Sequence, residues 1–416
     1  MTEELNTKDI LILTCVFSPE PVVSSRMALD LAKELSKKGN IVRVVCPFPS
    51  KTGGKLYKGY KRRFWSIDNT FKNFEVIRCF SFFSPKSKLI NRFLENFSFG
   101  FSSSIYLTFM RKKPDVIYLN TWPLFATIMN IFVAKVFKIR IVRSIKDVYP
   151  ESLISQNRLS KNSSFYKILE KIEDYCFKNS QENIVLSEKI GELIKSKNPE
   201  FNNFVTIADW NNITNQKDNL RKSSLDISLN EDDKLFIFAG NISAAANVEG
   251  IIQAFSNVAK NFPHVKLVIA GEGSMLPSCV DLVRILKQEK NISFFNPWKP
   301  EDTISLLKCA DILLLPTDRK QAFYSMPSKV ISYMFSERPI LAFGAKGSEL
   351  ENIIKSAKCG WFEEAFDEVE MEAAISKVIK LDNAKIAGLG SNGKSYMLNN
   401  LSKDANLKKY VNLITA

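Results

Sequence analysis

Apolar and polar positions along the chain follow two alternating patterns, which predict strands that are each followed by a helix. Residues 10–16 form a continuous apolar run, as expected of a strand buried on both faces of a sheet. From residue 27 to residue 35 apolar side chains recur three and four positions apart, and a glycine follows at 39, which predicts an amphipathic helix and its end. Further strands are predicted at 41–46, 74–80, 116–119, 139–143 and 184–186, and helices at 124–136 and 165–178.

A second series of the same kind follows a polar stretch at 211–233, which we interpret as the connection between two domains. Strands that alternate with helices imply parallel sheets with right-handed crossovers, and such sheets hold ligands at the carboxyl ends of their strands. The sequence therefore predicts an α/β protein of two doubly wound domains. The second series comprises strands at 235–240, 265–270, 291–295 and 312–315 and helices at 248–261, 276–288 and 304–307.

Length and cysteine usage agree with two globular domains in a reducing compartment. The chain has 416 residues, too many for one ordinary core, and 45% of them are hydrophobic. Its seven cysteines lack paired spacing, so we expect buried, reduced thiols and neither a disulfide framework nor a metal site. No signal peptide or spanning helix is expected, because the first residues are acidic and no apolar run reaches about 20 residues. Residues 122–137 are expected to form a packed helix, with a membrane-facing helix as the alternative.

The chain is strongly basic, with a formal charge of +14. Nucleic acid, an anionic membrane and a polyanionic small molecule all fit such a charge. Basic residues mix with aromatic ones at 51–63 and bracket a Phe-rich stretch at 93–109, which suits the headgroup layer of a membrane. An ordinary solvated surface explains either cluster equally well. No nucleic-acid motif accompanies the charge, so no nucleic-acid partner is expected.

The segment at 325–334 has a pattern that suits phosphate binding. A loop leads to Pro327, a short helix follows, and an apolar strand begins at Pro339. Proline at the first helical position needs no amide partner, and the free N–H groups and positive dipole end of a helix start favour an anion. The alternative is an ordinary helix-to-strand unit with no ligand.

Several short motifs occur along the chain, some in each predicted domain. They are Phe17-Ser18-Pro19-Glu20-Pro21, Ser24-Ser25, Asp30-Leu31-Ala32, Pro47-Phe48-Pro49, Asp147-Val148-Tyr149-Pro150-Glu151, Leu186-Ser187-Glu188, Gly240-Asn241-Ile242, Ala270-Gly271-Glu272-Gly273 and Met326-Pro327-Ser328-Lys329. In their order and spacing they resemble the retaining GT-B glycosyltransferases of family 4, especially the bacterial subgroup that builds O-antigen, capsule and colanic-acid sugars.

This resemblance implies a fold and a function. Two Rossmann-like domains would face a central cleft: an acceptor-binding domain at 1–212, with a C-terminal helix at 400–416 packed back onto it, and a donor-binding domain at 213–399. The implied donor is a nucleotide-diphosphate sugar. The implied acceptor is a polyprenyl-diphosphate-linked saccharide, met by a peripheral, cytoplasmic enzyme at the inner face of the cytoplasmic membrane. Neither a cofactor nor a metal is expected.

The resemblance also implies site residues. Those expected to bind the donor are Gly240, Asn241, Gly271, Gly273, Ser325, Met326, Pro327, Ser328, Lys329 and Ser332. Those expected to bind the acceptor are Ser24, Ser25, Lys51 and Tyr149. The carboxylates available for catalysis are Glu20, Asp147 and Glu151. Each of these carboxylates has an alternative role, because it can equally cap a helix or pair with a lysine.

Some positions depart from the family pattern. Ser332 stands where the family carries a ribose-binding Glu, and Asn241 and 244–246 stand where it carries basic residues. Asn120 occupies a position where many relatives have His, and the only histidine, His264, is expected at the surface. A retaining transferase tolerates the lack of a histidine base, because the departing phosphate itself takes the acceptor proton and the enzyme positions the reactants and stabilises charge.

Two other functions remain open from the sequence. A nucleotide-sugar 2-epimerase uses the same two-domain frame, but it needs carboxylates and usually histidines in its cleft, and this chain is poor in histidine. A non-catalytic relative that serves as a partner or scaffold would explain the missing basic residues. An assay of proton exchange in deuterated water would distinguish an epimerase from a transferase. Calorimetry with UDP and GDP would distinguish a non-catalytic relative, because the absence of any binding would favour it.

Overall fold

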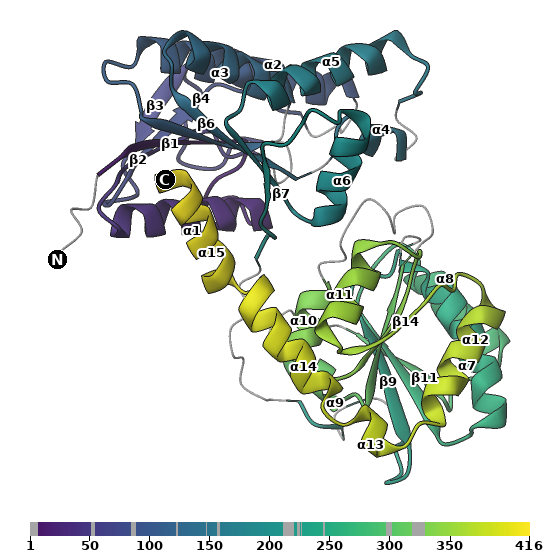
Figure 1. Cartoon of the computed structure of the whole chain (residues 1–416). Helices are drawn as coiled ribbons and strands as arrows, with labels where there is room; N and C mark the ends of the chain where they lie inside the picture. The colour runs from purple at the N-terminus through teal and green to yellow at the C-terminus, as the bar shows by residue number, and fades with distance from the viewer. Residues whose placement is uncertain are drawn as a thin grey trace. The chain divides into compact units, whose positions relative to one another are not determined.

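The chain forms two compact units in the computed structural model (Figure 1). Unit 1 comprises Met1–Trp210 and Lys403–Ala416, and unit 2 comprises Asn211–Ser402. These limits lie within a few residues of the domain borders expected from the sequence. The structure describes residues 7–50, 55–84, 89–121, 124–146, 148–155, 159–210, 220–222, 225, 227–243, 246–296, 302–317 and 329–416.

Unit 1 is built on an eight-stranded sheet with the order β3-β4-β2-β1-β5-β6-β7-β8. All neighbouring strands are parallel except β3, which pairs antiparallel with β4 at the edge. The strands are β1 (Asp9–Thr14), β2 (Ile41–Pro47), β3 (Trp65–Asp68), β4 (Glu75–Cys79), β5 (Val116–Thr121), β6 (Arg140–Ile145), β7 (Glu182–Val185) and β8 (Phe204–Thr206). Because the first strand lies inside the sheet, the strand order reverses between β1 and β5.

Helices cover both faces of this sheet, as Figure 1 shows. Ile10 and Ile12 of β1 pack with α1 and α15 on one face, whereas Leu11 and Leu13 pack with α2, α3 and α5 on the other. This alternation is what a strand buried on both faces produces. The helices are α1 (Val23–Lys37), α2 (Leu89–Phe109), α3 (Leu124–Val136), α4 (Glu151–Ser155), α5 (Ser164–Lys178), α6 (Glu188–Lys197) and α15 (Lys403–Thr415).

The C-terminal helix α15 is an integral part of unit 1. Its Tyr410 is fully buried and its ring lies 5.3 Å from that of Trp210. Asp30 of α1 accepts a hydrogen bond from Trp210 Nε1 (3.3 Å) and forms an ion pair with Lys403 (2.8 Å). One carboxylate thus anchors both points at which the chain leaves or re-enters unit 1.

Unit 2 has a six-stranded parallel sheet with the order β11-β10-β9-β12-β13-β14. One face packs against α7, α8 and α12, and α9, α10 and α11 contact the strands as well. The strands are β9 (Lys234–Ala239), β10 (Val265–Ala270), β11 (Ile292–Phe295), β12 (Ile312–Pro316), β13 (Ile340–Phe343) and β14 (Gly360–Glu363). The helices are α7 (Val248–Asn261), α8 (Leu276–Ile285), α9 (Thr303–Cys309), α10 (Lys329–Phe335), α11 (Glu349–Ala357), α12 (Glu368–Ile379), α13 (Asn383–Ile386) and α14 (Leu389–Tyr396), with a π-helical turn at Met397–Leu401.

Many predicted element limits differ from the structure by up to four residues, and two of these differences have a clear local cause. Helix α8 ends at Ile285, three residues before the expected end, because Lys287 adopts a left-handed φ of 56° that stops the helix. The first predicted strand ends at Thr14 instead of 16. Thr14 Oγ1 donates a hydrogen bond to the carbonyl of Val16 (2.9 Å), which turns the chain out of the sheet.

Two other expectations, about His264 and about the helix after residue 122, are met. His264 is exposed, and residues 124–136 form the packed helix α3. All seven cysteines are free thiols, and six of them are buried. Within the part of the chain that the structure describes, no helix combines the length and apolar character needed to cross a bilayer.

Candidate active site

Strands β9 and β12 diverge at their carboxyl ends, where the strand order of unit 2 reverses. The two strands pair only near their amino ends, where Ile312 lies opposite Phe236 and Leu313 lies opposite Ile237. The hydroxyl of Tyr333, from α10, enters the gap: it accepts a hydrogen bond from Ala239 N (2.8 Å) and lies 3.2 Å from Ala239 O. The phenol therefore satisfies backbone groups that the missing strand pairing leaves free. This split is the kind of crevice in which open α/β sheets hold ligands.

Lys329, the first residue of α10, lies beside the crevice and across Gly240. A Cβ placed on Gly240 would lie only 2.1 Å from Lys329 Cε and 2.8 Å from its Nζ. The Lys329 ammonium also sits 4.5 Å from the ring centroid of Phe238. No described Asp or Glu lies within ion-pair distance of it. The Lys329 ammonium therefore lies at the carboxyl end of β9 without an ion pair to any described carboxylate.

Burial changes the acidity of this ammonium group. Desolvation disfavours the charged form and lowers the pKa of Lys329 to about 8. An anionic ligand beside Nζ would favour the protonated form and raise the pKa again. The electrostatic setting thus favours a bound anion.

The loops that follow β9 and β10 pack backbone against backbone. A Cβ on Gly271 would lie 1.9 Å from Gly240 O, and one on Gly273 would lie 2.1 Å from Ile242 O. Both glycines have positive φ values, 139° and 157°. Ile242 N donates to Glu272 O (2.8 Å), which closes the contact between the loops. The structure therefore brings four expected donor residues together: Gly240, Gly271, Gly273 and Lys329.

Asn241 and Ser332 complete the described part of this region. Asn241 is exposed, and its Oδ1 would lie 2.7 Å from a Cβ on Gly273. Ser332 is half-buried, and its hydroxyl donates to the carbonyl of Lys329 (2.9 Å), one turn back in the same helix. The expected donor residues Ser325, Met326, Pro327 and Ser328 lie outside the described residues. Phosphate binding by the start of this helix stays a prediction.

In unit 1 the corresponding reversal of strand order lies between β1 and β5. Asn120 Nδ2 donates to Thr14 Oγ1 (3.3 Å) at the carboxyl ends of these strands. Ser24 and Ser25 follow β1 at the start of α1, where Ser24 is exposed and Ser25 is buried. Tyr149 follows β6 and packs at the edge of the apolar core. Lys51 and Asp147 lie outside the described residues.

The two described carboxylates with an expected catalytic role are both engaged with the protein. Glu20 is buried and accepts hydrogen bonds from Ser50 N (2.6 Å) and Tyr57 Oη (3.3 Å), so it ties the loop after β1 to the loop after β2. Glu151 begins α4, pairs with Lys197, and accepts from Tyr166 Oη (2.9 Å). The pair of Glu151 with Lys197 matches an alternative role that the sequence leaves open beside catalysis, whereas the hydrogen bonds of Glu20 to Ser50 and Tyr57 are of another kind. Burial lowers the pKa of Lys197 to about 8.

Arg78 on β4 is a positioning residue that the sequence analysis missed. Its side chain is only 1% exposed, and it forms an ion pair with Asp68 (2.9 Å). It also donates to the carbonyls of Ser18, in the loop after β1, and of Pro47, the last residue of β2. An arginine directly after Val76 and Ile77 in a predicted strand is the signal that could have identified it, because buried arginines are rare unless paired. Tyr333 gave no comparable signal.

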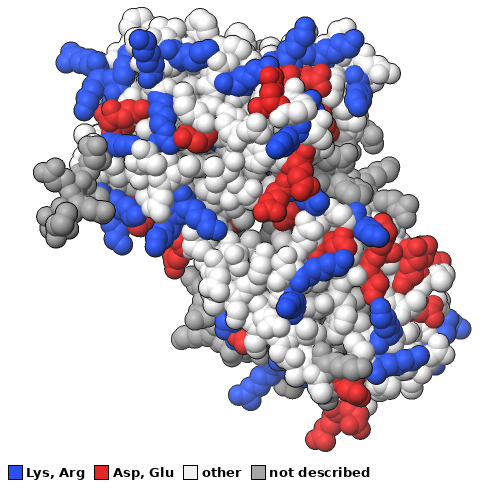
Figure 2. All heavy atoms as spheres, viewed as in Figure 1, with Lys and Arg blue, Asp and Glu red and all other residues white. Residues whose placement is uncertain are grey.

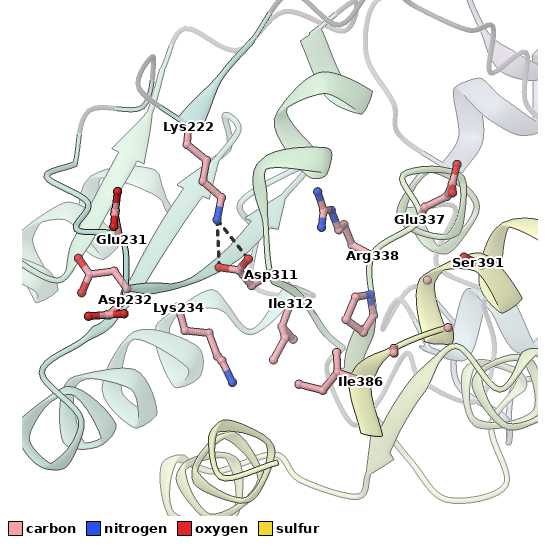
Figure 3. A pocket seen from close by; sticks show the side chains of 15 residues that line it. Lys222, Glu231, Asp232, Lys234, Asp311, Ile312, Glu337, Arg338, Ile386 and Ser391 are labelled. Carbon is pink, nitrogen blue, oxygen red and sulfur yellow. Dashed lines mark hydrogen bonds and ion pairs between the residues drawn. The ribbon is translucent and has the colours of Figure 1, made fainter. Parts of the chain in front are cut away.

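A separate cavity of about 400 Å³ opens at the amino ends of β9, β12 and β13, the opposite edge of the unit 2 sheet from Gly240 (Figure 3). In Figure 3 the Lys222 ammonium points at Asp311, with its Nζ 3.1 and 3.2 Å from the two carboxylate oxygens. Other charged residues that line this cavity include Glu231, Asp232 and Arg338. Its place at the amino edge of the sheet separates it from the crevice beside Lys329.

No set of three or more His, Cys, Asp or Glu side chains among the described residues has the arrangement of a metal site. The described part of the crevice offers a lysine, backbone groups and an amide side chain. These groups suit an anion rather than a divalent cation.

Comparison with known proteins is in line with this arrangement. Residues 24–203 match the family "Glycosyltransferase Family 4", and residues 221–412 match "Glycosyl transferases group 1". A protein of Pseudomonas aeruginosa described as "Probable glycosyltransferase WbjE" is 25% identical over 335 residues, which cover 80% of this chain and 82% of that protein.

Solved structures share the fold. Anabaena HepE, in complex with UDP and glucose, superposes with a TM-score of 0.66 at 14% identity, covering 98% of this chain and 100% of its own. WaaG, a glycosyltransferase involved in lipopolysaccharide biosynthesis, gives a TM-score of 0.63 at 16% identity, with 98% and 100% covered. With a Family 4 part followed by a group 1 part on this two-domain frame, the chain is a glycosyltransferase of the GT-B type.

Proposed function

We propose that this glycosyltransferase moves a sugar from a nucleotide-diphosphate sugar to a polyprenyl-diphosphate-linked saccharide. The donor binds at the carboxyl edge of unit 2, and the acceptor binds at unit 1. The enzyme works peripherally at the inner face of the cytoplasmic membrane, in the assembly of a bacterial surface polysaccharide such as O-antigen or capsule. The observation that carries the proposal is the Lys329 ammonium, which faces the crevice without a described acidic partner.

The donor phosphates would lie beside Lys329 and the loops at Gly240–Asn241 and Gly271–Gly273. As the bond between the anomeric carbon and the phosphate oxygen breaks, negative charge grows on the diphosphate. A fixed ammonium group stabilises that charge more in the transition state than in the ground state, which is the condition for faster chemistry. The close packing of the two glycine loops keeps the backbone rigid, so little reorganisation accompanies the reaction.

The proposed mechanism retains the configuration of the anomeric carbon. The acceptor oxygen forms its bond to the anomeric carbon on the face from which the diphosphate leaves. The acceptor proton passes to the departing phosphate oxygen, so the protein does not have to supply a general base. The engagement of Glu20 with Ser50 and Tyr57 supports this route, because these hydrogen bonds stabilise the charged carboxylate and make it a weaker base.

Relatives support the choice of donor and pathway. HepE is described in complex with UDP and glucose, and WaaG is described as involved in lipopolysaccharide biosynthesis. Their folds match this chain over nearly its whole length, and in unit 2 the Lys329 ammonium lies beside Gly240, where the strand order reverses. We therefore propose a nucleoside diphosphate as the common part of the donor.

The test is a transfer assay with the full-length protein. It is incubated with a panel of UDP- and GDP-sugars and a lipid-linked saccharide acceptor, and products are analysed by mass spectrometry and by the anomeric coupling constant in NMR. Transfer with the donor's anomeric configuration kept is the expected result. Transfer with inversion would overturn the retaining mechanism. Absence of both transfer and nucleotide binding in folded protein would overturn the proposed function.

A further inference from the structure

We propose that the exposed aromatic face of unit 1 docks onto an anionic lipid bilayer. This face, the α2 surface, consists of Ile90, Leu94, Phe97 and Phe101 on α2 together with Arg62, Arg63, Phe64 and Trp65 beside them. The docking role rests on the proposed function, because a lipid-linked acceptor places a membrane beside unit 1.

Helix α2 is apolar on two faces, and the fold needs only one of them. Phe99 and Leu107 are buried in the core of unit 1. Along the other side run Ile90, Leu94, Phe97 and Phe101, with exposed fractions of 62%, 41%, 43% and 50%. Their spacing of four, three and four residues places them in one line along the helix. A solvent-facing apolar line of this length indicates a contact outside the chain.

The apolar line continues onto the strand edge of the sheet. The Phe64 ring lies 6.5 Å from Phe101 and 5.3 Å from Trp65, and both Phe64 and Trp65 are more than a third exposed. Phe64 and Phe101 line a shallow, mostly apolar groove of about 500 Å³, which Phe80 and Phe97 also line. Tryptophan and phenylalanine at such a surface suit the boundary between lipid headgroups and acyl chains.

Positive charge borders the aromatic face. Arg62 and Arg63 are exposed and line the groove, and no described carboxylate lies within ion-pair distance of either. The Arg62 guanidinium lies 4.5 Å from the Phe83 ring centroid and 5.5 Å from that of Phe80, so the positive charge itself rests against the aromatic rings. Figure 2 shows further Lys and Arg side chains along the outer edge of unit 1, where Figure 1 draws α2, α3 and α5.

An anionic bilayer fits this combination better than a second copy of the chain does. The one acidic residue of α2, Glu95, is already paired with Arg92 (2.7 Å). A second copy would bring the same uncompensated arginines to the contact, whereas phosphate-bearing headgroups neutralise them. The apolar line would then enter the headgroup layer beside those phosphates.

Vesicle binding by the full-length protein tests the assignment. Vesicles of phosphatidylcholine alone are compared with vesicles that contain phosphatidylglycerol, by sedimentation at low and high salt. Wild type is expected to prefer the anionic vesicles and to dissociate from them in high salt. Arg62→Gln with Arg63→Gln should weaken binding about fivefold for each arginine. Phe97→Ser with Phe101→Ser should weaken it at least about tenfold. Ile285→Ser, which removes an apolar side chain that is 75% exposed in unit 2, should bind as wild type does.

Two further readouts separate the possible outcomes. Brominated lipids should quench tryptophan fluorescence in wild type, and Trp65→Phe should remove part of that quenching. A short-chain, water-soluble acceptor should be used equally well by wild type and by all four variants. If wild type fails to transfer sugar to this soluble acceptor, the result contradicts the proposed function and leaves the membrane surface as a separate question that vesicle binding answers. Unchanged vesicle binding by the arginine and phenylalanine variants would overturn the assignment. If wild type is a dimer, and these variants are monomers that still bind vesicles normally, the α2 surface is an interface between two copies of the chain. That result would also overturn the proposed membrane docking.

Discussion

The side chain of Lys329 occupies the space that a side chain on Gly240 would need. A Cβ on Gly240 would lie 2.1 Å from Lys329 Cε, and Gly240 has a φ of 150°. Gly240 is the first residue after β9, and Lys329 is the first residue of α10. Because Gly240 has no side chain, the Lys329 ammonium can reach the carboxyl edge of the sheet. This pairing places a cation where nucleotide phosphates are proposed to bind.

Substitution of Gly240 by alanine should displace the Lys329 side chain. The added methyl group cannot coexist with the present position of Lys329 Cε, so the ammonium must move and nucleotide affinity should fall. The positive φ adds a backbone strain of about 1–3 kcal/mol to the free energy of folding. Gly388→Ala serves as the matched control, because Gly388 has a φ of 83° but open space around its Cβ position. Calorimetry with UDP and GDP should show weakened binding only for Gly240→Ala. Equal affinity in both variants would contradict the proposed role of the contact.

Removal of the Lys329 charge should weaken nucleotide binding directly. A hydrogen bond to a charged group contributes about 2 kcal/mol, so Lys329→Met should raise the Kd for the nucleoside diphosphate about 30-fold. Lys290→Met removes an exposed lysine of unit 2 and should leave the Kd unchanged. The nucleoside, which lacks phosphates, should bind wild type and Lys329→Met with similar affinity. A similar loss of nucleoside affinity would indicate a general structural defect in place of a lost phosphate contact.

Nucleotide affinity should fall as the pH rises through about 8. In the free protein burial lowers the pKa of Lys329 to about 8, below its ordinary value of 10.5. Only the protonated form attracts a phosphate, so above this pH the free enzyme must first take up a proton, and affinity falls up to about tenfold per pH unit. In Lys329→Arg the cation persists throughout this range. The ratio of wild-type to Lys329→Arg affinity, measured from pH 7 to pH 9.5, should therefore decline above pH 8. A constant ratio would exclude Lys329 as the titrating group.

Arg78 should be required for the stability of unit 1. Its guanidinium is buried against Asp68 and holds the carbonyls of Ser18 and Pro47. Arg78→Met removes the buried guanidinium and leaves the half-buried Asp68 with only its hydrogen bonds from Thr70 and Tyr60, which should lower the free energy of unfolding by about 3 kcal/mol. Arg111→Met, at an exposed arginine of the same unit, should change it by less than about 0.5 kcal/mol. Urea unfolding followed by tryptophan fluorescence measures both. Coincident transitions for the two variants would show that the Arg78 contacts add no net stability.

The hydrophobic pattern predicted the buried, regular elements of the fold well. Helices α3 and α7 and strand β10 have the predicted limits. The apolar residues of α7 recur with a helical period, and α3 and β10 are mostly apolar segments. Strand β3, at the antiparallel edge, was missed because its four residues are exposed or half-buried and carry little apolar pattern. Helix α2 was recognised only as a Phe-rich stretch, because apolar residues on two faces obscure its period.

The candidate site was predictable where it depends on local motifs. The glycines after β9 and β10 and the lysine at the start of α10 were expected from the motifs that resemble family 4 glycosyltransferases, and donor binding by these residues stays a prediction. The contact between Gly240 and the Lys329 side chain was not predicted from the sequence. Tyr333 and Arg78 act through contacts with residues 94 and 60 positions away, and such contacts have no signature in a single sequence.

Hydrogen–deuterium exchange with and without a nucleoside diphosphate tests the central claim most directly, because it reports where on the chain the ligand binds. Protection is predicted at Gly240–Asn241, at Gly271–Gly273 and around the start of α10, and it should be lost in Lys329→Met. Protection around Lys222 and Asp311 at the opposite edge of the sheet, or unchanged exchange at the carboxyl edge under saturating nucleotide, would contradict it.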